Sequence, residues 1–320
     1  MDSSRLNAFL VCVLTTIAAL SPAFAQDLVV GGKGFTEQRL MAEMTSQLLR
    51  AKGFRVNVRT GFATSGLRRE QEAGLVDVYW EYTGTSLITF NQVTEKLAPD
   101  VAYEKVKELD GRKGLVWLSP SKVDNTYALA MRQADATAKG ITSVSDLAAR
   151  ARRGERFRLV CNTEFYIRPD GLMPLLRTYG FDFASVTRMD RDQIYDVLRT
   201  SSDVDVGLVF STDGRIAAFD LRVLHDDRGF FPSYRLTPVV RQQTLDRHPE
   251  IAVHLNALSA KLDNTTMASL NGKVDLEKKP VEEVAASFLR VSEVGPQHLD
   301  GIHSSDDRPR GGGPGPGEWR

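Results

Sequence analysis

The chain has 320 residues, of which 42% are hydrophobic and 26% are charged, and its 41 Lys and Arg residues are balanced by 41 Asp and Glu residues. Without a basic excess, the electrostatic attraction that drives phosphate binding is missing, so nucleic acid is not expected as a partner. A chain of this length exceeds one compact hydrophobic core, and we therefore expect two lobes.

The first 25 residues have the pattern of a cleaved signal peptide. Arg5 precedes an apolar run over residues 8–20, and Ala23-Phe24-Ala25 has the small-x-small form that signal peptidase cuts. The apolar run is shorter than the ~20 residues that a membrane-spanning helix needs. We expect the mature chain to begin near Gln26 and to be a free periplasmic protein. Cys161 is then its one cysteine, so stability must come from a hydrophobic core and not from an internal disulfide.

From residue 27 onward, short β-branched runs alternate with amphipathic helical stretches, which indicates consecutive βαβ units. The first series predicts strands over residues 28–30, 54–58 and 76–79 and helices over residues 37–51 and 66–73. Sheets of this kind are covered by helices on both faces and bind ligands outside the carboxyl ends of their strands. We expect the ligand site at that edge.

A second series of the same kind follows. It predicts strands over residues 127–131, 158–161 and 204–209, helices over 171–179 and 192–200, and a helix that opens at Ser143 or Ser145. The later chain then returns to the first lobe. We expect there a strand that contains Val239 and Val240, followed by helices over residues 251–262, 264–271 and 281–290.

These elements predict an α/β fold with two lobes, each a mostly parallel sheet flanked by helices. Lobe 1 comprises residues 26–126 plus 230–303, and lobe 2 comprises residues 127–229. The chain crosses twice between the lobes, and the two crossings would form a hinge. Residues 304–320 are rich in Gly, Pro and charge and are expected to be a disordered tail, because they cannot bury enough apolar surface to fold.

The segment Lys33-Gly34-Phe35-Thr36-Glu37-Gln38 puts a glycine turn directly after an apolar strand. Thr36 is placed to cap the following helix. Free backbone N–H groups at that helix start, together with Lys33, can hold a carboxylate. A capped helix beside a solvated lysine is the alternative. The segment lacks the later glycines of a dinucleotide fingerprint and the Gly-Lys-Ser/Thr of a P-loop.

Aromatic residues end the third strand of lobe 1. Strand alternation should send Trp80 and Tyr82 to one side and Tyr79 to the other, so some of these rings belong to the core. Tyr82 becomes a ligand candidate because Thr83-Gly84-Thr85 starts a helix beside it. The same weighing applies to three later rings, each of which would be packing if taken alone: Tyr127, Phe210 and Tyr234.

Arg168 stands directly before Pro169-Asp170-Gly171, where the proline restricts the backbone and the turn leads into a helix. Its guanidinium can grip a carboxylate with two parallel hydrogen bonds, and a surface pair with Asp170 is the alternative. Cations of this kind combined with tyrosine faces suit a small zwitterion such as a betaine. A quaternary ammonium donates no hydrogen bonds but is attracted to ring faces.

These segments, in this order, resemble the periplasmic substrate-binding proteins of ABC importers for osmoprotectants such as glycine betaine, choline and proline betaine. The resemblance covers essentially the whole mature chain to about Ser292. Its most specific segments are Lys33–Gln38, Glu81–Thr85, Tyr127–Ala130, Arg168–Leu172, Ser211–Gly214 and Pro232–Tyr234.

The resemblance implies a two-lobed clamp of the type II binding-protein class that delivers its solute to a permease of the inner membrane. It also implies a monomer that needs no cofactor and no metal. By position, an aromatic cage for the quaternary ammonium falls on Tyr82, Tyr127, Phe210 and Tyr234. The other site positions are Lys33, Thr85 and Arg168 for the carboxylate, and Asn125, which lends a backbone carbonyl near the methyl groups.

The chain departs from this resemblance in two places. Phe210 stands where relatives often carry tyrosine, but it keeps the ring face that a cation needs. Tyr166 and Ile167 stand before Arg168 where smaller residues are common, so we expect a narrower or shifted pocket.

Two other functions stay open at this point. An enzyme acting on a small carboxylate is the less favoured, because the chain has no Gly-x-Ser-x-Gly elbow, no His-Glu-x-x-His and no cluster among its five histidines. A binding protein for a different small zwitterion or an amino acid would have the same fold, because function resides in the site.

Overall fold

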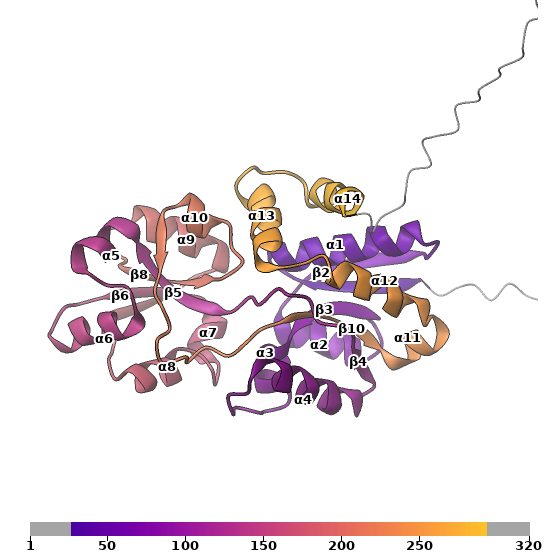
Figure 1. Cartoon of the computed structure of the whole chain (residues 1–320), viewed down its shortest axis with the longest axis horizontal. Coiled ribbons are helices and arrows are strands. Elements are labelled where there is room, and N and C mark those ends of the chain that lie inside the picture. The colour runs from indigo at the N-terminus through magenta and orange to yellow at the C-terminus, as the bar shows by residue number, and fades with distance from the viewer. Residues whose placement is uncertain (1–26, 293–320) are drawn as a thin grey trace, which may run out of the picture.

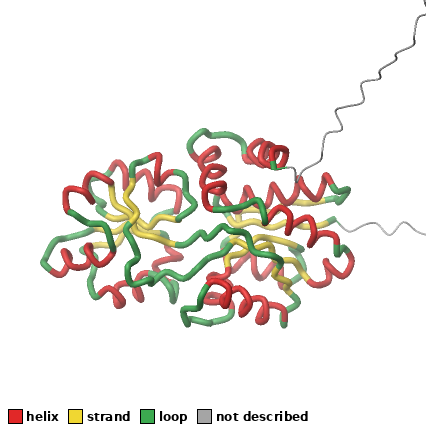
Figure 2. The backbone as a smooth tube through the Cα atoms, viewed as in Figure 1, coloured by secondary structure: helices red, strands yellow, loops and turns green. Residues whose placement is uncertain are grey.

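The computed structural model describes residues 27–292 and shows an α/β protein built on two five-stranded sheets flanked by helices (Figure 1, Figure 2). The α/β prediction is confirmed. One detail is corrected, because both sheets are mixed, with strands that run against their neighbours. The predicted signal peptide at residues 1–25 and the predicted tail at residues 304–320 lie outside the described residues.

The first sheet joins four early strands to one late strand, in the spatial order β2 (Val56–Phe62), β1 (Leu28–Lys33), β3 (Val78–Tyr82), β10 (Leu236–Arg241) and β4 (Leu115–Trp117). β1 is parallel to β2 and β3, whereas β10 is antiparallel to β3 and β4. β2 and β3 end later than the expected residues 58 and 79. All five residues of β3 are buried, so this central strand lacks the alternation that marks a strand with one exposed face.

The first sheet is covered on both faces (Figure 1). One face carries α1 (Thr36–Ala51), α12 (Glu250–Ser259), α13 (Asn264–Asp275) and α14 (Val281–Val291), and α11 (Gln242–Arg247) follows β10. The other face carries α2 (Thr64–Glu72), α3 (Thr83–Thr85) and α4 (Pro99–Gly111), with the π-helical turn η1 (Ser86–Phe90) directly after α3. Trp80 and Tyr82 pack in one core cluster and Tyr79 in another, which confirms the predicted alternation.

The second sheet repeats this arrangement with strands from the middle of the chain, in the order β7 (Ser185–Arg188), β6 (Arg158–Cys161), β8 (Val206–Phe210), β5 (Tyr127–Arg132) and β9 (Leu221–Val223). β6 is parallel to β7 and β8, and β5 is antiparallel to β8 and β9. Its helices are α5 (Gln133–Lys139), α6 (Val144–Arg152), α7 (Thr163–Ile167), α8 (Leu172–Tyr179), α9 (Arg191–Thr200) and α10 (Arg215–Ala218).

Ser143 and Cys161 both lie in the second half, the part of the protein built on the second sheet. Ser143 caps α6: its hydroxyl accepts a bond from the Asp146 backbone N–H, and the Asp146 carboxylate accepts one from the Ser143 backbone N–H. The first of the two expected helix starts is therefore correct. Cys161 is a buried free thiol whose pKa is raised to about 11, chiefly by burial. Burial therefore keeps this thiol protonated and unreactive at neutral pH.

The chain passes between the two sheets twice, and the two passing segments are bonded to each other. The first runs from β4 to β5 and the second from β9 to β10 (Figure 2). The carboxylate of Asp124 accepts hydrogen bonds from the backbone N–H of Tyr234 at 2.6 Å and from the hydroxyl of Ser233 at 2.7 Å. The predicted lobe limits at residues 126 and 230 remain predictions.

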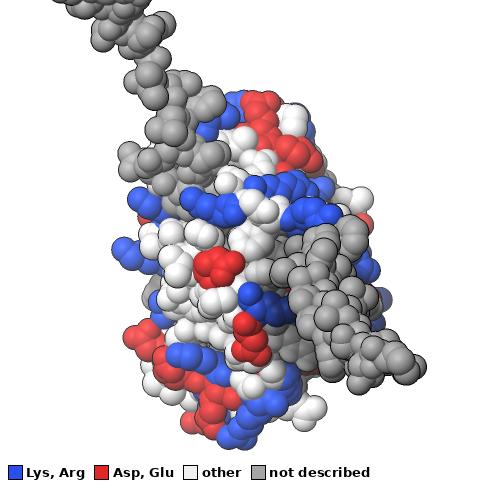
Figure 3. All heavy atoms as spheres, turned by 90° about the vertical axis from the view of Figure 1, so that its right-hand side faces the viewer, with Lys and Arg blue, Asp and Glu red and all other residues white. Residues whose placement is uncertain are grey.

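Charge is evenly mixed on the end of the molecule that Figure 3 presents. Lysine and arginine side chains lie among aspartate and glutamate side chains there, and the chain as a whole carries 41 residues of each sign. This face therefore offers no large surface of one sign that would attract a polyanion.

A buried ionic cluster holds α2, α4 and β4 together. The fully buried carboxylate of Asp110 accepts two bonds from Arg68, each at 2.7 Å, and further bonds from Ser86, Asn91 and Trp117. Burial alone would raise the pKa of this carboxyl, but the bonds from Arg68, Asn91 and Ser86 and the charge of Arg68 outweigh burial and lower it. The cluster is thus stabilising only while Asp110 is ionised.

We predict that Asp110→Asn lowers the free energy of unfolding by about 3–5 kcal/mol at pH 7, because it leaves the buried Arg68 guanidinium without its main counter-ion. A carboxyl with a lowered pKa stabilises above its unfolded pKa of about 3.9, and that stabilisation is lost as the pH falls through the folded value. The deficit of the variant should therefore shrink below about pH 4.

Urea unfolding of the wild type, of Asp110→Asn and of Asp100→Asn at several pH values measures this deficit. Asp100 pairs with Arg235 at the surface, where its side chain is 94% exposed, so its variant should lose less than about 1 kcal/mol. Equal deficits in both variants would contradict the assignment.

Candidate ligand-binding site

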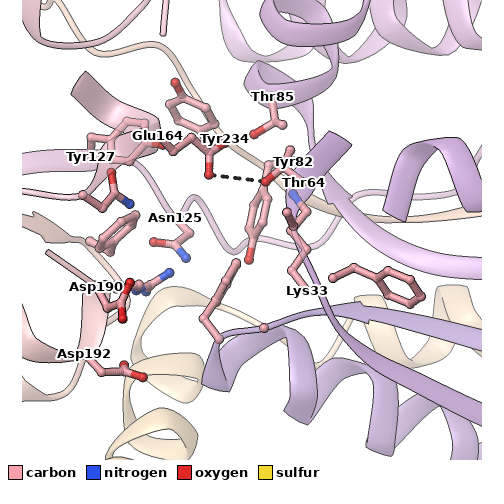
Figure 4. Close-up of a pocket in the computed structure, with 17 residues that line it drawn as sticks. Lys33, Thr64, Tyr82, Thr85, Asn125, Tyr127, Glu164, Asp190, Asp192 and Tyr234 are labelled. Atoms are coloured by element: carbon pink, nitrogen blue, oxygen red, sulfur yellow. Dashed lines mark hydrogen bonds between the residues drawn. The ribbon is translucent and has the colours of Figure 1, made fainter. Parts of the chain in front are cut away.

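A pocket of about 410 Å³ is lined by residues from both halves of the protein, the first half built on the first sheet and the second half built on the second sheet. This volume is within the range of roughly 300–1,000 Å³ that small-molecule sites occupy. Figure 4 shows side chains from both halves pointing into it. Seven of the eight predicted site residues line it, namely Lys33, Tyr82, Thr85, Asn125, Tyr127, Phe210 and Tyr234.

Antiparallel strand pairing brings the four predicted rings together. Tyr127 begins β5 and is the register partner of Phe210 at the end of β8, so their ring centroids are 5.2 Å apart. Tyr82 ends β3 opposite Leu236 of β10, which places Tyr234 nearby in the same pocket. Tyr127 and Tyr234 meet edge to face at 5.4 Å. The arrangement presents ring faces and edges from both halves to one volume.

A glycine allows α3 to approach Tyr234 closely. A Cβ atom on Gly84 would lie 2.7 Å from the carbonyl oxygen of Ser233 and 2.9 Å from the Tyr234 ring, and neither distance is tolerated. The glycine in Thr83-Gly84-Thr85 therefore allows α3, which carries Thr85, to pack directly against the Tyr234 ring.

Tyr82 and Tyr127 remain neutral at physiological pH. Burial, followed by the charge of Glu37 and the hydrogen bond to it, raises the pKa of Tyr82 well above its usual value. Burial also raises the pKa of Tyr127, partly offset by Arg168. Neutral phenol rings keep the negative face that attracts cations.

The carboxylate of Glu37 is the centre of the hydrogen-bond network behind the rings, and sequence reasoning missed it. The residue is 1% exposed. It accepts bonds from the Tyr82 hydroxyl at 2.7 Å, the Asn125 amide at 2.9 Å, the Thr212 hydroxyl at 2.5 Å and the Asn271 amide at 3.1 Å. These donors come from β3, the first crossing segment, the loop after β8, and α13. One side chain thus links both halves to the Tyr82 ring.

The rest of the Lys33–Gln38 segment differs partly from expectation. Phe35, and not Thr36, occupies the N-cap position of α1, and it makes no side-chain capping bond. The Thr36 hydroxyl instead donates to Asp275 at 2.6 Å, so the cap prediction was wrong. Lys33 lines the pocket, but its ammonium bonds Glu81 at 2.6 Å in a buried ion pair, which rules out the alternative of a solvated lysine.

Arg168 is the one predicted site residue that does not line the pocket. Its buried guanidinium holds Asp170 with two bonds at 2.7 and 2.8 Å, and it also contacts Glu164 at 3.2 Å and the Tyr234 hydroxyl at 3.3 Å. The sequence left open whether Arg168 binds a ligand carboxylate or pairs with Asp170 at the surface. The ion pair with Asp170 is present, but it is buried. Arg168 lies behind the rings of Tyr127 and Tyr234, at 5.9 and 5.7 Å from their centroids.

Further pocket residues follow strand ends that the sequence analysis did not connect with the site. Glu164 in α7 accepts a bond from Thr64 of α2 at 3.3 Å, drawn dashed in Figure 4, and so links the two halves. Arg191 begins α9, and its guanidinium lies against Phe210. The rule that ligands bind beyond strand ends would have indicated both, since each follows a strand of the second sheet. The remaining lining residues are Gly34, Phe35, Phe62, Ala63, Asn162, Asp190 and Asp192.

Tyr166 and Ile167 do not narrow the pocket. Ile167 is 70% exposed and neither residue is part of the lining, while Arg188 stacks on Tyr166 at 4.9 Å. The prediction that these residues narrow the pocket is therefore wrong, and the prediction that they shift it stays a prediction. Within residues 27–292 there is no cluster of three or more metal-ligating side chains, and no helix is long and apolar enough to cross a membrane.

A family model described as the substrate binding domain of the ABC-type glycine betaine transport system (OpuAC) matches residues 26–291. The chain belongs to this family. Its relatives include the glycine-betaine-binding protein of Pseudomonas aeruginosa, which is 43% identical over 295 residues, with 90% of this chain and 94% of that protein covered. The glycine betaine-binding protein YehZ of Escherichia coli is 32% identical, with 87% of this chain and 94% of that protein covered.

A third relative carries a different solute in its name. The ergothioneine transport permease/ergothioneine binding protein EgtU of Helicobacter pylori is 32% identical over 89% of this chain, which spans about half (52%) of that protein. Among solved structures, apo YehZ from Escherichia coli has a TM-score of 0.66 at 31% identity, covering 84% of this chain and all of that one. A glycine betaine/carnitine/choline ABC transporter structure has a TM-score of 0.71 at 28% identity, covering 84% and 99%.

Family membership fixes the general role of the chain. It is the substrate-binding component of an ABC importer for osmolytes of the glycine betaine and choline type. It is a binding protein and not an enzyme, and it acts outside the cytoplasm as the family does. The two mixed sheets match the type II binding-protein structures.

We predict that Glu37→Gln lowers the free energy of unfolding by about 3 kcal/mol. All four groups around the carboxylate act as donors. An amide in its place points its own NH₂ group at two of these donors, so the two hydrogen bonds on that side are lost. Hydrogen bonds to a charged group contribute about 1.5–3 kcal/mol each. Urea unfolding measures the loss. Glu43→Gln on the same helix, where the carboxylate is bonded by Gln47, should lose less than about 1 kcal/mol. An unchanged midpoint for Glu37→Gln would show that the network does not stabilise the fold.

Proposed function

We propose that the pocket binds the quaternary ammonium of a glycine betaine-like osmolyte on the rings of Tyr82, Tyr127, Phe210 and Tyr234. The observation that carries this proposal is the convergence of four rings from both sheets on one buried volume, in a chain of the glycine betaine family. A quaternary ammonium cannot donate hydrogen bonds, so ring faces are the groups best suited to hold it. If each ring contributes about 0.5–2 kcal/mol, their sum is comparable to much of the ~8 kcal/mol of a micromolar complex.

The polar groups of the pocket support a second contact region for the ligand. Lys33 and Thr85 line the same volume and are proposed to face the carboxylate. Arg168 is proposed to act from behind, by holding Asp170 and the Tyr234 hydroxyl in place. Asn125 has a buried side-chain oxygen without a hydrogen-bond partner among the described residues, and this oxygen supports a role for Asn125 beside the methyl groups, whose polarised C–H bonds it can accept.

We further propose that ligand binding closes the two halves as a clamp, and that the closed form docks on an inner-membrane permease from the periplasm as a monomer. The contacts from Glu37 to Thr212 and from Thr64 to Glu164 join residues of the two halves around the pocket. A ligand that touches both halves shifts the open and closed populations only by its differential affinity for them. The paired crossing segments at Asp124 and Tyr234 support a hinge there.

A different betaine is the second candidate ligand. The relative named for ergothioneine is as similar to this chain as YehZ is, at 32% identity. Ergothioneine also carries a trimethylammonium and a carboxylate, so the same ring cage would accept its cation. The preferred ligand is decided by the groups at the other end of the pocket.

We predict that titration calorimetry of residues 26–320 detects binding of at least one quaternary ammonium among glycine betaine, choline, proline betaine, carnitine and ergothioneine. Tyr127→Ala should weaken this binding by about 2- to 30-fold, because one ring is lost. Tyr127→Phe keeps the ring, and Tyr166→Ala removes a ring outside the pocket, so both should bind as the wild type does. A panel of amino acids is titrated in the same way. Binding of an amino acid without binding of any quaternary ammonium would overturn the ligand assignment.

We predict that ligand binding makes the protein more compact, because the two halves close on the ligand. Small-angle scattering should show a smaller radius of gyration when the protein is saturated with the ligand found by calorimetry, because the halves approach each other. Scattering that stays the same at saturation would contradict the clamp while leaving the ligand assignment intact.

A further inference from the structure

Arg191 places a guanidinium between aromatic rings of the two halves. It is the first residue of α9, which follows β7. Its guanidinium carbon lies 3.6 Å from the ring centroid of Phe210 and 4.5 Å from that of Phe35. Phe35 precedes α1 in the first half, and Phe210 ends β8 in the second half. The group lines the pocket beside the proposed cage.

The charge of Arg191 is the least compensated of the three cations considered in and around the pocket. Lys33 bonds Glu81 at 2.6 Å, and Arg168 holds Asp170 with two bonds. Within the described residues, Arg191 comes within 4.0 Å of one carboxylate only, that of Asp213 at 3.9 Å, which is beyond hydrogen-bond distance.

The carboxylate of Asp213 is already occupied by a different cation. It accepts bonds from the Arg215 guanidinium at 2.9 and 2.7 Å and from the Arg215 backbone at 3.0 Å. Hydrogen-bond donors of Arg191 are therefore available to a further acceptor, although its side chain is only 13% exposed.

The other charged residues of the lining are mostly acidic. Glu164, Asp190 and Asp192 line the pocket together with the cations Lys33 and Arg191. Asp190 and Asp192 are exposed, and Asp192 also lies 3.3 Å from Arg215, so water and that cation weaken their effect. Glu164 is paired with Arg168 at 3.2 Å, which weakens its effect too. Removing Arg191 nevertheless leaves three carboxylates and one paired lysine in the lining, a surrounding that disfavours an anionic group relative to a ligand with positive charge alone.

We propose that Arg191 is a specificity-determining residue that binds the carboxylate of a zwitterionic betaine and so sets the preference for betaines over choline. This inference rests on the proposed function of the pocket. A guanidinium can stack its flat face on Phe210 while its edge donates two parallel bonds to a carboxylate. Choline has no carboxylate, so it gains no bond from Arg191 and experiences the repulsion of a like charge.

Calorimetry with glycine betaine and choline on matched variants tests this inference. Arg191→Met keeps the length and the apolar stem but removes the charge, and it should weaken glycine betaine binding roughly 10- to 100-fold. The same change should leave choline binding unaltered or make it tighter. Arg191→Lys keeps the charge without the planar fork and should recover part of the affinity for glycine betaine. Arg188→Met removes an arginine three residues away that stacks on Tyr166, so it should leave both affinities unchanged.

Each other outcome overturns the inference in a recognisable way. Equal weakening of both ligands, with unfolding midpoints unchanged, would make Arg191 a support for the Phe210 ring. Tighter binding of both ligands would mean that the guanidinium competes with the ligand cation for that ring. If the wild-type protein binds neither of these ligands nor proline betaine, carnitine or ergothioneine, the proposed function fails first, and this inference fails with it.

Discussion

The buried carboxylate of Glu37 is the constraint on which the site depends. A carboxylate out of water is costly unless its oxygens are fully bonded, and the four donors around it are all uncharged groups. The position of Glu37 in the first turn of α1 also helps, since the helix start favours negative charge. Satisfying this one group fixes the Tyr82 ring, the Asn125 amide and the Thr212 loop at once. The position of the Tyr82 ring therefore depends on how the fold accommodates a buried charge.

The strand order explains why such a wall forms between the halves. In each sheet one strand runs against its neighbours, β10 in the first and β5 in the second, and both lie next to a crossing segment. An antiparallel pair brings the end of one strand to the start of another. This geometry brings Tyr82 and Tyr234 to the same pocket in the first half, and it pairs Tyr127 with Phe210 in the second. The reversed strands that the βαβ pattern could not reveal are thus the ones that assemble the site.

The sequence predicted the sheet-forming elements and the rings better than the charges. Tyr82 is found from its place at the end of a strand, because the period of a strand and the position of its end are local properties. Tyr127 instead begins an antiparallel strand, and it was assigned to the cage through the family resemblance. The partners of charged side chains are set by tertiary contacts instead. Glu37 was overlooked because its donors are 45 to 234 residues away along the chain. Arg168 was placed in the pocket because its fixed pairing with Asp170, two residues on, could not be distinguished from a free guanidinium. Arg191 has no sequence motif around it.

The pattern of compensated charge limits where ligand selectivity can arise. The fold provides its own carboxylates for Lys33 and Arg168, and each ion pair is buried. A ligand carboxylate that displaced either partner would leave a protein charge unpaired at low dielectric, at a cost that commonly exceeds the gain. A group at the pocket wall that lacks hydrogen-bond partners in the protein can bond a ligand without breaking an existing ion pair, so this cost does not arise. Selectivity among quaternary ammonium solutes should accordingly depend on the Arg191 guanidinium, while the rings and the Asn125 oxygen beside the methyl groups supply an attraction that every such cation shares.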